Sequence, residues 1–157
     1  MPDDAAAVLV SLHPGFAQAI SEGSKTVELR RRFPDIPPGT WLVVYVTQPV
    51  GAVVGMVRIE AVVRAPIERL WCQVRCHAGI SEATFFDYFS GCSEGTGVFL
   101  GERRAVGPFL AAEMDEIIPG FRPPQSFRYV ERSGLAALER SAAASRNQRR
   151  FCFERTT

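Results

Sequence analysis

The sequence lacks any apolar run that approaches the roughly 18 residues a membrane-spanning helix needs. It also lacks the basic leader of a signal peptide, because the chain opens with the acidic stretch Met-Pro-Asp-Asp. The formal net charge is only +1, so no global electrostatic attraction draws the chain toward nucleic acid. These absences predict a cytoplasmic protein with no membrane partner.

Cysteine is scarce, and its spacing matches no metal signature. The four cysteines are Cys72, Cys76, Cys92 and Cys152. Cys72, Cys76 and His77 form the pattern C-x3-C-H, which is not a zinc-binding spacing. Without a secretory signal, free thiols are expected rather than disulfides. The sequence also offers no Ser-His-Asp or Cys-His nucleophile set, and we predict no metal and no cofactor.

Lysine is almost absent. Of the eighteen basic residues, seventeen are arginine and one is Lys25. An Arg- and Ala-rich composition is typical of a GC-rich genome, in which lysine codons are scarce. Arginine would supply a surface charge at this position equally well, so the presence of the one lysine here is informative.

The length of 157 residues fits one domain of ordinary size. Short apolar segments predict strands at 8–12, 26–32, 41–47, 52–63 and 97–106, with 109–110 as an extension of the sheet. Helices are expected from Pro14 to Gly23, from Pro66, from Ser81 to Gly91, and over 123–130. There is no internal repeat. Strands clustered with helices between them indicate a small α+β fold with a curled sheet or barrel.

The segment from Gly23 to Arg30 reads G-x-K-T-x-E-x-R and joins a predicted helix to a predicted strand. Gly23 either ends the helix with a positive φ or lets a phosphate or base approach the backbone. Strand alternation places Val27 and Leu29 on the core face and sends Glu28, Arg30 and Arg32 to the other face. The motif therefore predicts a polar face next to a helix end.

The segment 12–32, with this motif, resembles the ASCH family. The resemblance continues through Pro-Pro-Gly at 37–39, Val-Val-Gly at 53–55, Leu-Trp at 70–71 and Pro-Pro-Gln-Ser-Phe at 123–127, and it covers roughly residues 8–131. It implies a PUA-like small β-barrel flanked by short helices. It also implies RNA or nucleotide binding in a cleft at the motif, with a regulatory role in translation or transcription.

The resemblance implies a nucleic-acid or nucleotide-binding set at the motif and on the following strand. This set is Gly23, Ser24, Lys25, Thr26, Glu28, Arg30 and Arg32. Lys25 is either a solvated cation or a contact to phosphate or base, and burial would also make it a base or nucleophile. Glu28 pairs with Lys25 or Arg30, or accepts a hydrogen bond from an exocyclic amine. The expected partner is RNA, single-stranded nucleic acid or a modified nucleoside.

Two alternative functions remain beside binding. Some ASCH proteins are amidohydrolases that deacetylate acetylcytidine with a lysine, a threonine and a glutamate, and others resemble ribonucleases. If this chain is an enzyme, Lys25 and Glu28 are its catalytic residues. Lys25 matches the lysine, but Glu28 stands where the threonine is expected, Thr26 is on another phase of the strand, and Glu60 is a distant candidate carboxylate. The second alternative is a protein-interaction adaptor.

The last part of the chain differs in composition. We predict an ASCH domain over 1–131 and an Ala-, Ser- and Arg-rich tail over 132–157, which forms a marginal helix or is disordered. The tail interleaves basic residues with Phe151 and Phe153, a pattern that suits single-stranded nucleic acid but is also typical of a solvated tail. Because the tail shows no strong apolar stripe, deleting it from Gly134 onward is expected to leave the domain folded.

Overall fold

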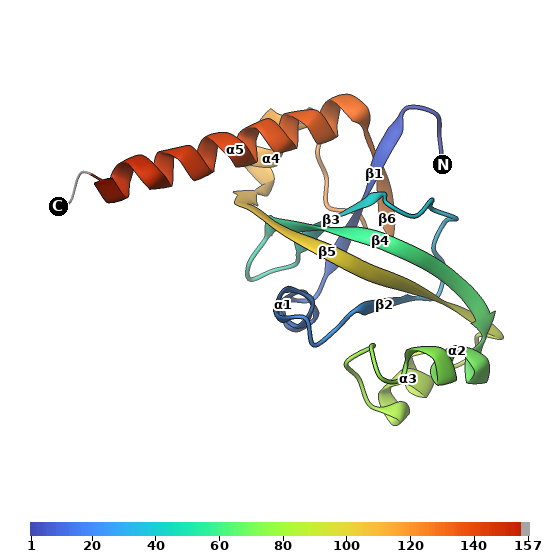
Figure 1. The fold of residues 1–157 in the computed structure, drawn as a ribbon. Coiled ribbons are helices and arrows are strands. Elements are labelled where there is room, and N and C mark those ends of the chain that lie inside the picture. Colours follow the sequence, from blue (N-terminus) through green and yellow to red (C-terminus); the bar gives the residue numbers. More distant parts are fainter. Residues whose placement is uncertain (155–157) are drawn as a thin grey trace.

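The computed structural model describes the backbone of residues 1–154 and the side chains of residues 1–146. Six strands form one curved mixed sheet in the order β2-β5-β4-β3-β1-β6 (Figure 1). β1 and β3 run parallel, whereas the other neighbouring strands are antiparallel. The strands are β1 (Ala5–Leu12), β2 (Val27–Arg30), β3 (Trp41–Val46), β4 (Ala52–Pro66), β5 (Glu94–Leu110) and β6 (Phe127–Glu131).

Helices lie at both ends of this sheet (Figure 1). α1 and the α2–α3 pair lie near β2, and α4 and α5 lie near the opposite end of β5. The helices are α1 (Pro14–Glu22), α2 (Ile67–Val74), α3 (Glu82–Tyr88), α4 (Ala111–Ile117) and α5 (Arg132–Glu154). In the described part of the chain, no helix is both long and apolar enough to cross a membrane.

The long antiparallel pair β4–β5 gives the sheet its curvature. The two strands pair from Ala52–Leu110 at one end to Pro66–Glu94 at the other, with register shifts near Gly55, Ile59 and Ala61. Such irregularities bend a strand and increase its twist. The curved sheet separates three apolar clusters, and the third of them, around Leu70, Phe85 and Phe89, packs α2 and α3 against the β2 end.

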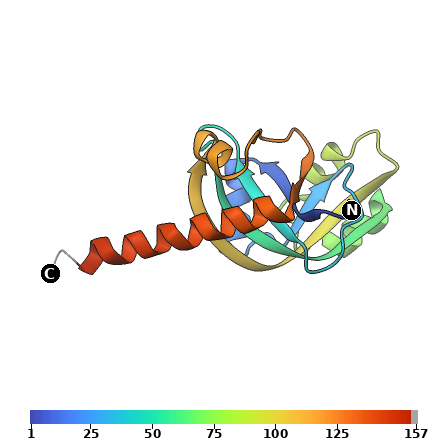
Figure 2. The same cartoon turned by 90° about the horizontal axis from the view of Figure 1, so that it is seen from above.

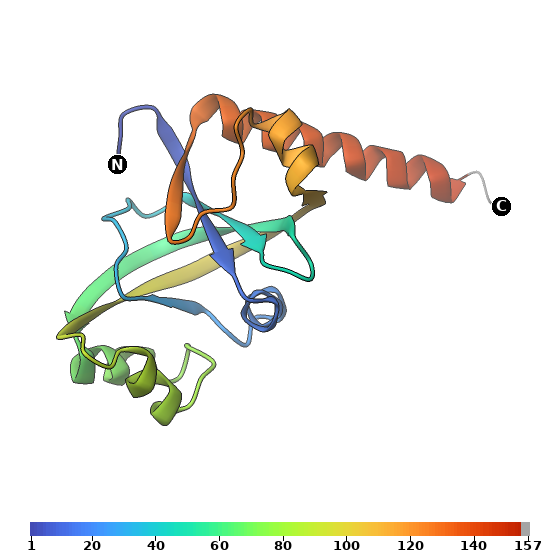
Figure 3. The same ribbon diagram turned by 180° about the vertical axis from the view of Figure 1, so that it is seen from behind.

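The α+β class and the curled sheet are confirmed, but the β-barrel implied by the resemblance is wrong, because the sheet stays open between its edge strands β2 and β6. β2 is only four residues long and pairs with β5 alone. A side chain spans the gap instead: the Arg30 guanidinium donates to Ser11 O at 3.0 Å and to Ser126 O at 3.2 Å, joining β2 to β1 and to the loop before β6. Figure 3 shows this open side from behind.

The C-terminal segment is helical from Arg132 onward, and its first half belongs to the core. Leu138 is fully buried and Ala142 is 3% exposed, both in the cluster around Trp41 and Met114. One face of the first turns of α5 therefore packs in the core, although the segment shows no strong apolar stripe. The far half of α5 runs past the body of the molecule (Figure 2).

Two predicted elements need correction, and one extension is confirmed. The region 123–130 is a loop followed by β6, because Phe127 to Val130 pair with the otherwise free edge of β1. The strand expected over 26–32 ends at Arg30, after which the chain bends away from the sheet. The extension at 109–110 is confirmed, since β5 runs to Leu110.

Candidate functional site

A cavity of about 240 Å³ opens where α1, β2 and α3 meet. Its floor is polar and consists of Lys25, Glu28 and Arg30, whereas apolar and aromatic side chains form most of the wall. The lining residues are Ser11, Leu12, His13, Phe16, Lys25, Glu28, Leu29, Arg30, Ile80, Thr84 and Tyr88. Ligand cavities for drug-sized molecules are usually about 300–1,000 Å³, so this one suits a smaller group such as a single nucleobase or nucleoside.

The end of α1 directs Lys25 into this floor. Gly23 ends the helix with a φ of 83°, and the Lys25 N–H donates to Ala19 O. The following residues are tied to the turn after α2, where Thr26 and Val27 both donate to His77 O. These bonds leave the Lys25 side chain only 3% exposed, so the lysine is buried.

The Lys25 ammonium has three neighbours. Nζ donates to Ala78 O at 3.0 Å, lies 3.6 Å from Glu28 Oε2, and lies 5.2 Å from the centroid of the Phe16 ring. Burial lowers the pKa of Lys25 below its ordinary value, while the Glu28 carboxylate opposes part of that shift. The amine is therefore easier to deprotonate than a surface lysine.

Glu28 lies between two cations. Its Oε1 is 3.0 Å from Arg30 Nε, although the buried Nε–H does not point at an acceptor with hydrogen-bond geometry. The two remaining Arg30 nitrogens donate to backbone carbonyls. Since two cations face one carboxylate, the floor carries a net positive charge while each charged group keeps a partner.

Aromatic and hydroxyl side chains surround the mouth. Phe16 is 44% exposed, and Tyr88 is half-buried on the α3 side. His13 also lines the cavity, and its Nδ1 accepts the Gly15 N–H at 3.3 Å as the cap of α1. Thr84 adds an exposed hydroxyl from α3. A flat ligand thus meets ring faces at the mouth and charged groups at the floor.

The ASCH domain family profile matches residues 10–98, a span that contains every residue that lines the cavity. An ASCH domain-containing ribonuclease from Zymomonas mobilis is 36% identical over 138 residues, which cover 88% of this chain and 93% of that protein. The crystal structure of the ASCH protein from Zymomonas mobilis matches with a TM-score of 0.81 at 33% identity, covering 86% of this chain and 94% of that one. A mutant of that protein matches with the same TM-score at 32% identity, over 86% and 97% of the two chains.

The chain belongs to the ASCH family.

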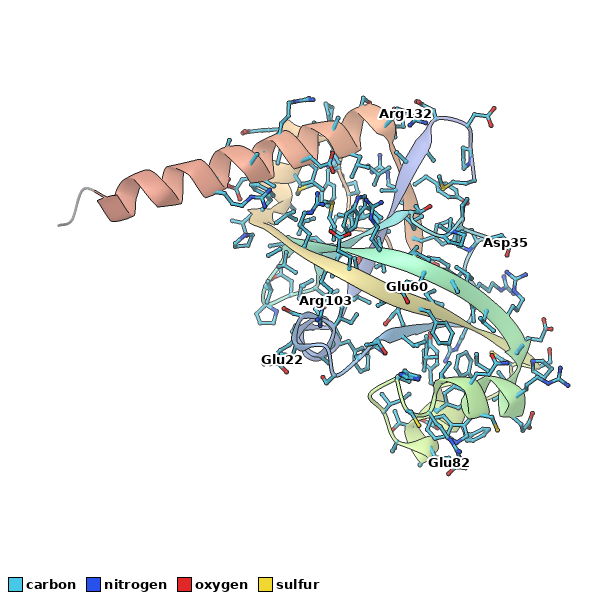
Figure 4. The ribbon with its side chains drawn as sticks, in the orientation of Figure 1. Glu22, Asp35, Glu60, Glu82, Arg103 and Arg132 are labelled. Atoms are coloured by element: carbon cyan, nitrogen blue, oxygen red, sulfur yellow. The ribbon has the colours of Figure 1, made fainter. Side chains whose placement is uncertain are left out.

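Within this ASCH domain, the predicted binding residues do not all meet. Lys25, Glu28 and Arg30 line the cavity described above. Gly23 and Thr26 line a second, smaller recess beside Arg103, whose guanidinium donates to Ile20 O, and Lys25 lines this recess as well as the cavity. Figure 4 shows the Arg103 side chain directed toward α1.

The other two predicted residues lie outside both spaces. Ser24 is exposed, and its hydroxyl donates to Ala19 O as part of the helix end. Arg32 follows the end of β2 and lines a groove on the far side of Tyr88 and Arg31. Alternation along an extended strand does not hold there, because the strand has already ended.

Several cavity residues of the ASCH domain were not predicted as site residues. Phe16, Thr84 and Tyr88 come from helices, and helical spacing alone does not show that Phe16, which is 44% exposed, faces the cavity mouth rather than the core.

The more distant candidates lie elsewhere. Glu60 is exposed on β4 beside Gly101 of β5 and does not line the cavity (Figure 4). In the part of the chain with described side chains, no group of three or more metal-ligating residues comes together. The tail residues Arg149, Arg150, Phe151, Phe153 and Arg155 fall outside the side chains that the structure describes.

Proposed function

We propose that this ASCH protein binds single-stranded RNA by taking one base into the cavity over Lys25, Glu28 and Arg30. The observation that carries the proposal is a buried, net positive floor beneath an exposed aromatic ring, in a space about the size of one nucleoside. The relative from Zymomonas mobilis that is named a ribonuclease supports RNA as the class of ligand.

The floor offers hydrogen bonds of both kinds to the edge of a base. An ammonium has three N–H donors, and Lys25 directs one to Ala78 O and one toward Glu28, which leaves one for a ligand. Carboxylate oxygens accept several hydrogen bonds each, so Glu28 accepts from an exocyclic amine beside its two cations. Single-stranded RNA suits this arrangement, because its unstacked bases are free to turn onto aromatic side chains.

Replacing Phe16 tests the proposal with little risk to folding, since this ring is largely exposed. Base–aromatic stacking contributes about 1–3 kcal/mol per base, so Phe16→Ala should weaken binding of a labelled single-stranded RNA by roughly 5- to 150-fold. Val50→Ala is the matched control, because Val50 is 42% exposed and lies outside the cavity. Fluorescence anisotropy gives the two affinities. Equal affinities for both variants would contradict base binding at this mouth.

RNA cleavage is the second candidate function, and the name of the 36% identical relative favours it. In such a reaction the ribose 2′-oxygen attacks the adjacent phosphorus, the next nucleotide leaves through its 5′-oxygen, and a 2′,3′-cyclic phosphate remains. Lys25 is the group in the cavity suited to accept the 2′-hydroxyl proton, because burial lowers its pKa. Glu28 is less suited, since both of its oxygens face cations.

A cleavage assay separates this activity from binding alone. End-labelled RNA is incubated with the protein and with a Lys25→Met variant purified in the same way, and the products are resolved on a denaturing gel. Loss of cleavage in the variant identifies Lys25 as the source of the activity. Equal cleavage by both preparations would assign it to a contaminating nuclease.

For deacetylation of acetylcytidine we still predict little or no turnover, because Glu28 occupies the position at which proteins with that activity have a threonine. Chromatography of acetylcytidine after incubation with the protein measures it directly. Turnover that disappears in Lys25→Ala would make the protein an amidohydrolase instead.

A further inference from the structure

We propose that a groove next to the cavity binds the phosphodiester backbone of the RNA whose base occupies the cavity. This arginine groove has a volume of about 670 Å³ and is lined by Arg31, Arg32, Phe33, Arg64 and the segment 91–95. It lies between the chain that follows β2 and the loop that joins α3 to β5. The inference rests on the proposed RNA binding and adds a second subsite to it.

The cavity and the arginine groove share a wall. Tyr88 lines the cavity, and its backbone oxygen accepts from both Nε and Nη2 of Arg31 at 2.9 and 2.8 Å. The Arg31 guanidinium also lies 4.8 Å from the centroid of the Tyr88 ring. These contacts fix Arg31 at the border, where a phosphate attached to a bound nucleoside would leave the cavity.

The arginines of the groove retain capacity for an anion. Arg32 is exposed and has no hydrogen bond or ion pair among the described residues, and Arg31 Nη1 is likewise unengaged there. Arg64 Nη2 donates to Phe33 O at 3.0 Å, which orients a side chain that remains 49% exposed. Guanidinium groups bind phosphate oxygens through paired N–H donors, so this set suits a phosphodiester.

Acidic residues reduce the positive charge of the groove without cancelling it. Glu94 is the one carboxylate in the lining, and Asp35 lies 3.8 Å from Arg64 at a site that is 94% exposed. An ion pair this exposed contributes little and yields readily to a competing anion. Gly91 meets no neighbour within 4 Å of its Cβ position, which leaves open space for a sugar–phosphate chain.

Salt dependence of RNA binding tests the arginine groove. Each neutralised phosphate contributes about 0.7 to the slope of log K against log salt for a single strand. We expect Arg32→Gln and Arg64→Gln each to reduce the magnitude of the slope by about this amount. The matched control is Arg69→Gln, which removes the same charge from an exposed position on α2 outside the groove. Thermal melts establish that all three variants are folded.

A neutral-backbone oligonucleotide separates phosphate contacts from base contacts. With a methylphosphonate strand, Arg32→Gln should bind as tightly as the wild-type protein, whereas Phe16→Ala should still bind more weakly. If the wild type binds RNA but Arg32→Gln has the same slope of log K against log salt as the control Arg69→Gln, the arginine groove does not bind the RNA backbone. The proposal of base binding in the cavity would then still stand. If the wild type binds no RNA even at low salt, both proposals are wrong.

Discussion

Lys25 has its ammonium between a carbonyl and a carboxylate, with 3% of its surface exposed. Arginine carries the same charge, but its wide planar fork cannot take the place of a compact ammonium in this space. The one lysine of this arginine-rich chain therefore occupies a position that suits a side chain more compact than arginine and able to lose its proton.

We expect Lys25→Arg to weaken RNA binding nearly as much as Lys25→Ala. Both variants should also lose stability, and for Lys25→Arg the loss should be about 1–3 kcal/mol, because a larger group strains a packed site. For Lys25→Ala the loss should stay below the roughly 3–5 kcal/mol of an orphaned buried charge, since Glu28 keeps Arg30 as a partner. Paired anisotropy and urea unfolding measure both effects. Full binding by Lys25→Arg would reduce Lys25 to a simple positive charge.

The lowered pKa of Lys25 also predicts how stability changes with pH. Between that pKa and about 10.4, the unfolded chain binds more protons than the folded one at this residue, so its contribution to the unfolding free energy rises with pH. Below the lowered pKa the cost of the buried ammonium is present in full. The unfolding free energy of the wild type should therefore rise relative to that of Lys25→Met as the pH rises from neutral to about 10. A pH-independent difference in unfolding free energy would contradict the lowered pKa.

At the scale of the element, β2 owes its position to the Arg30 side chain as well as to β5. Arg30 reaches two carbonyls on other segments and a carboxylate on its own strand. It is therefore a positioning residue for Glu28 and for the edge of the sheet, and its donors are largely occupied before any ligand arrives.

Replacing Arg30 with lysine keeps the charge near Glu28 but cannot span both carbonyls. Each hydrogen bond contributes about 0.5–1.5 kcal/mol, so Arg30→Lys should lower the local opening free energy of β2 by roughly 1–3 kcal/mol. Hydrogen exchange of the β2 amides measures this change. Arg122→Lys is the control, because the Arg122 side chain is 80% exposed. Unchanged exchange in β2 would show that the pairing with β5 alone holds the strand.

α5 joins the core through one face of its first turns. Leu138→Ala should destabilise the protein by about 2–5 kcal/mol, because a fully buried leucine leaves a cavity when truncated. Leu110→Ala is the same substitution at a site that is 55% exposed, and it should stay within about 0.5 kcal/mol. Urea unfolding compares the two. Equal losses would mean that the burial of Leu138 contributes nothing specific.

At the scale of the whole molecule, α5 and the sheet share one apolar cluster, to which Met114, Val130 and Leu138 all belong. A chain that ends at residue 131 would expose that cluster, so we expect it to melt without a cooperative transition and to bind an apolar dye. The full-length protein under the same conditions is the reference. A cooperative melt of residues 1–131 near the full-length midpoint would restore the boundary predicted from composition.

The sequence predicts the individual strands of this fold better than it predicts whether the sheet closes into a barrel. Short apolar runs locate β1, β3, β4 and β5, because strands buried in the core are rich in apolar and β-branched residues. The open edge has no such local signal, since it depends on which strands pair over long sequence distances and on the long-range contacts of Arg30 with Ser11 and Ser126. Leu138 was missed because a helix that docks through two or three side chains shows only a weak apolar stripe.

The functional site shows the same difference between local features, which the sequence predicts, and long-range contacts, which it does not. The motif locates Lys25, Glu28 and Arg30 because they are close in sequence and share one short segment. Tyr88 and Thr84 join them only after α2 and α3 fold back over β2, an arrangement of tertiary packing that no local pattern encodes. Arg32 was placed on the same face by extending the strand beyond its true end.

The open edge of the sheet has a mechanical consequence. A load that pulls β2 away from β6 acts on the Arg30 guanidinium with its two carbonyl contacts and on the packing of Phe33 against Phe127, whereas a load across β4 and β5 is shared along the whole paired length of two long strands. The molecule should therefore resist stretching unequally in different directions. The hydrogen bonds that join the open edge lie at the floor of the cavity, where Arg30 also meets Glu28.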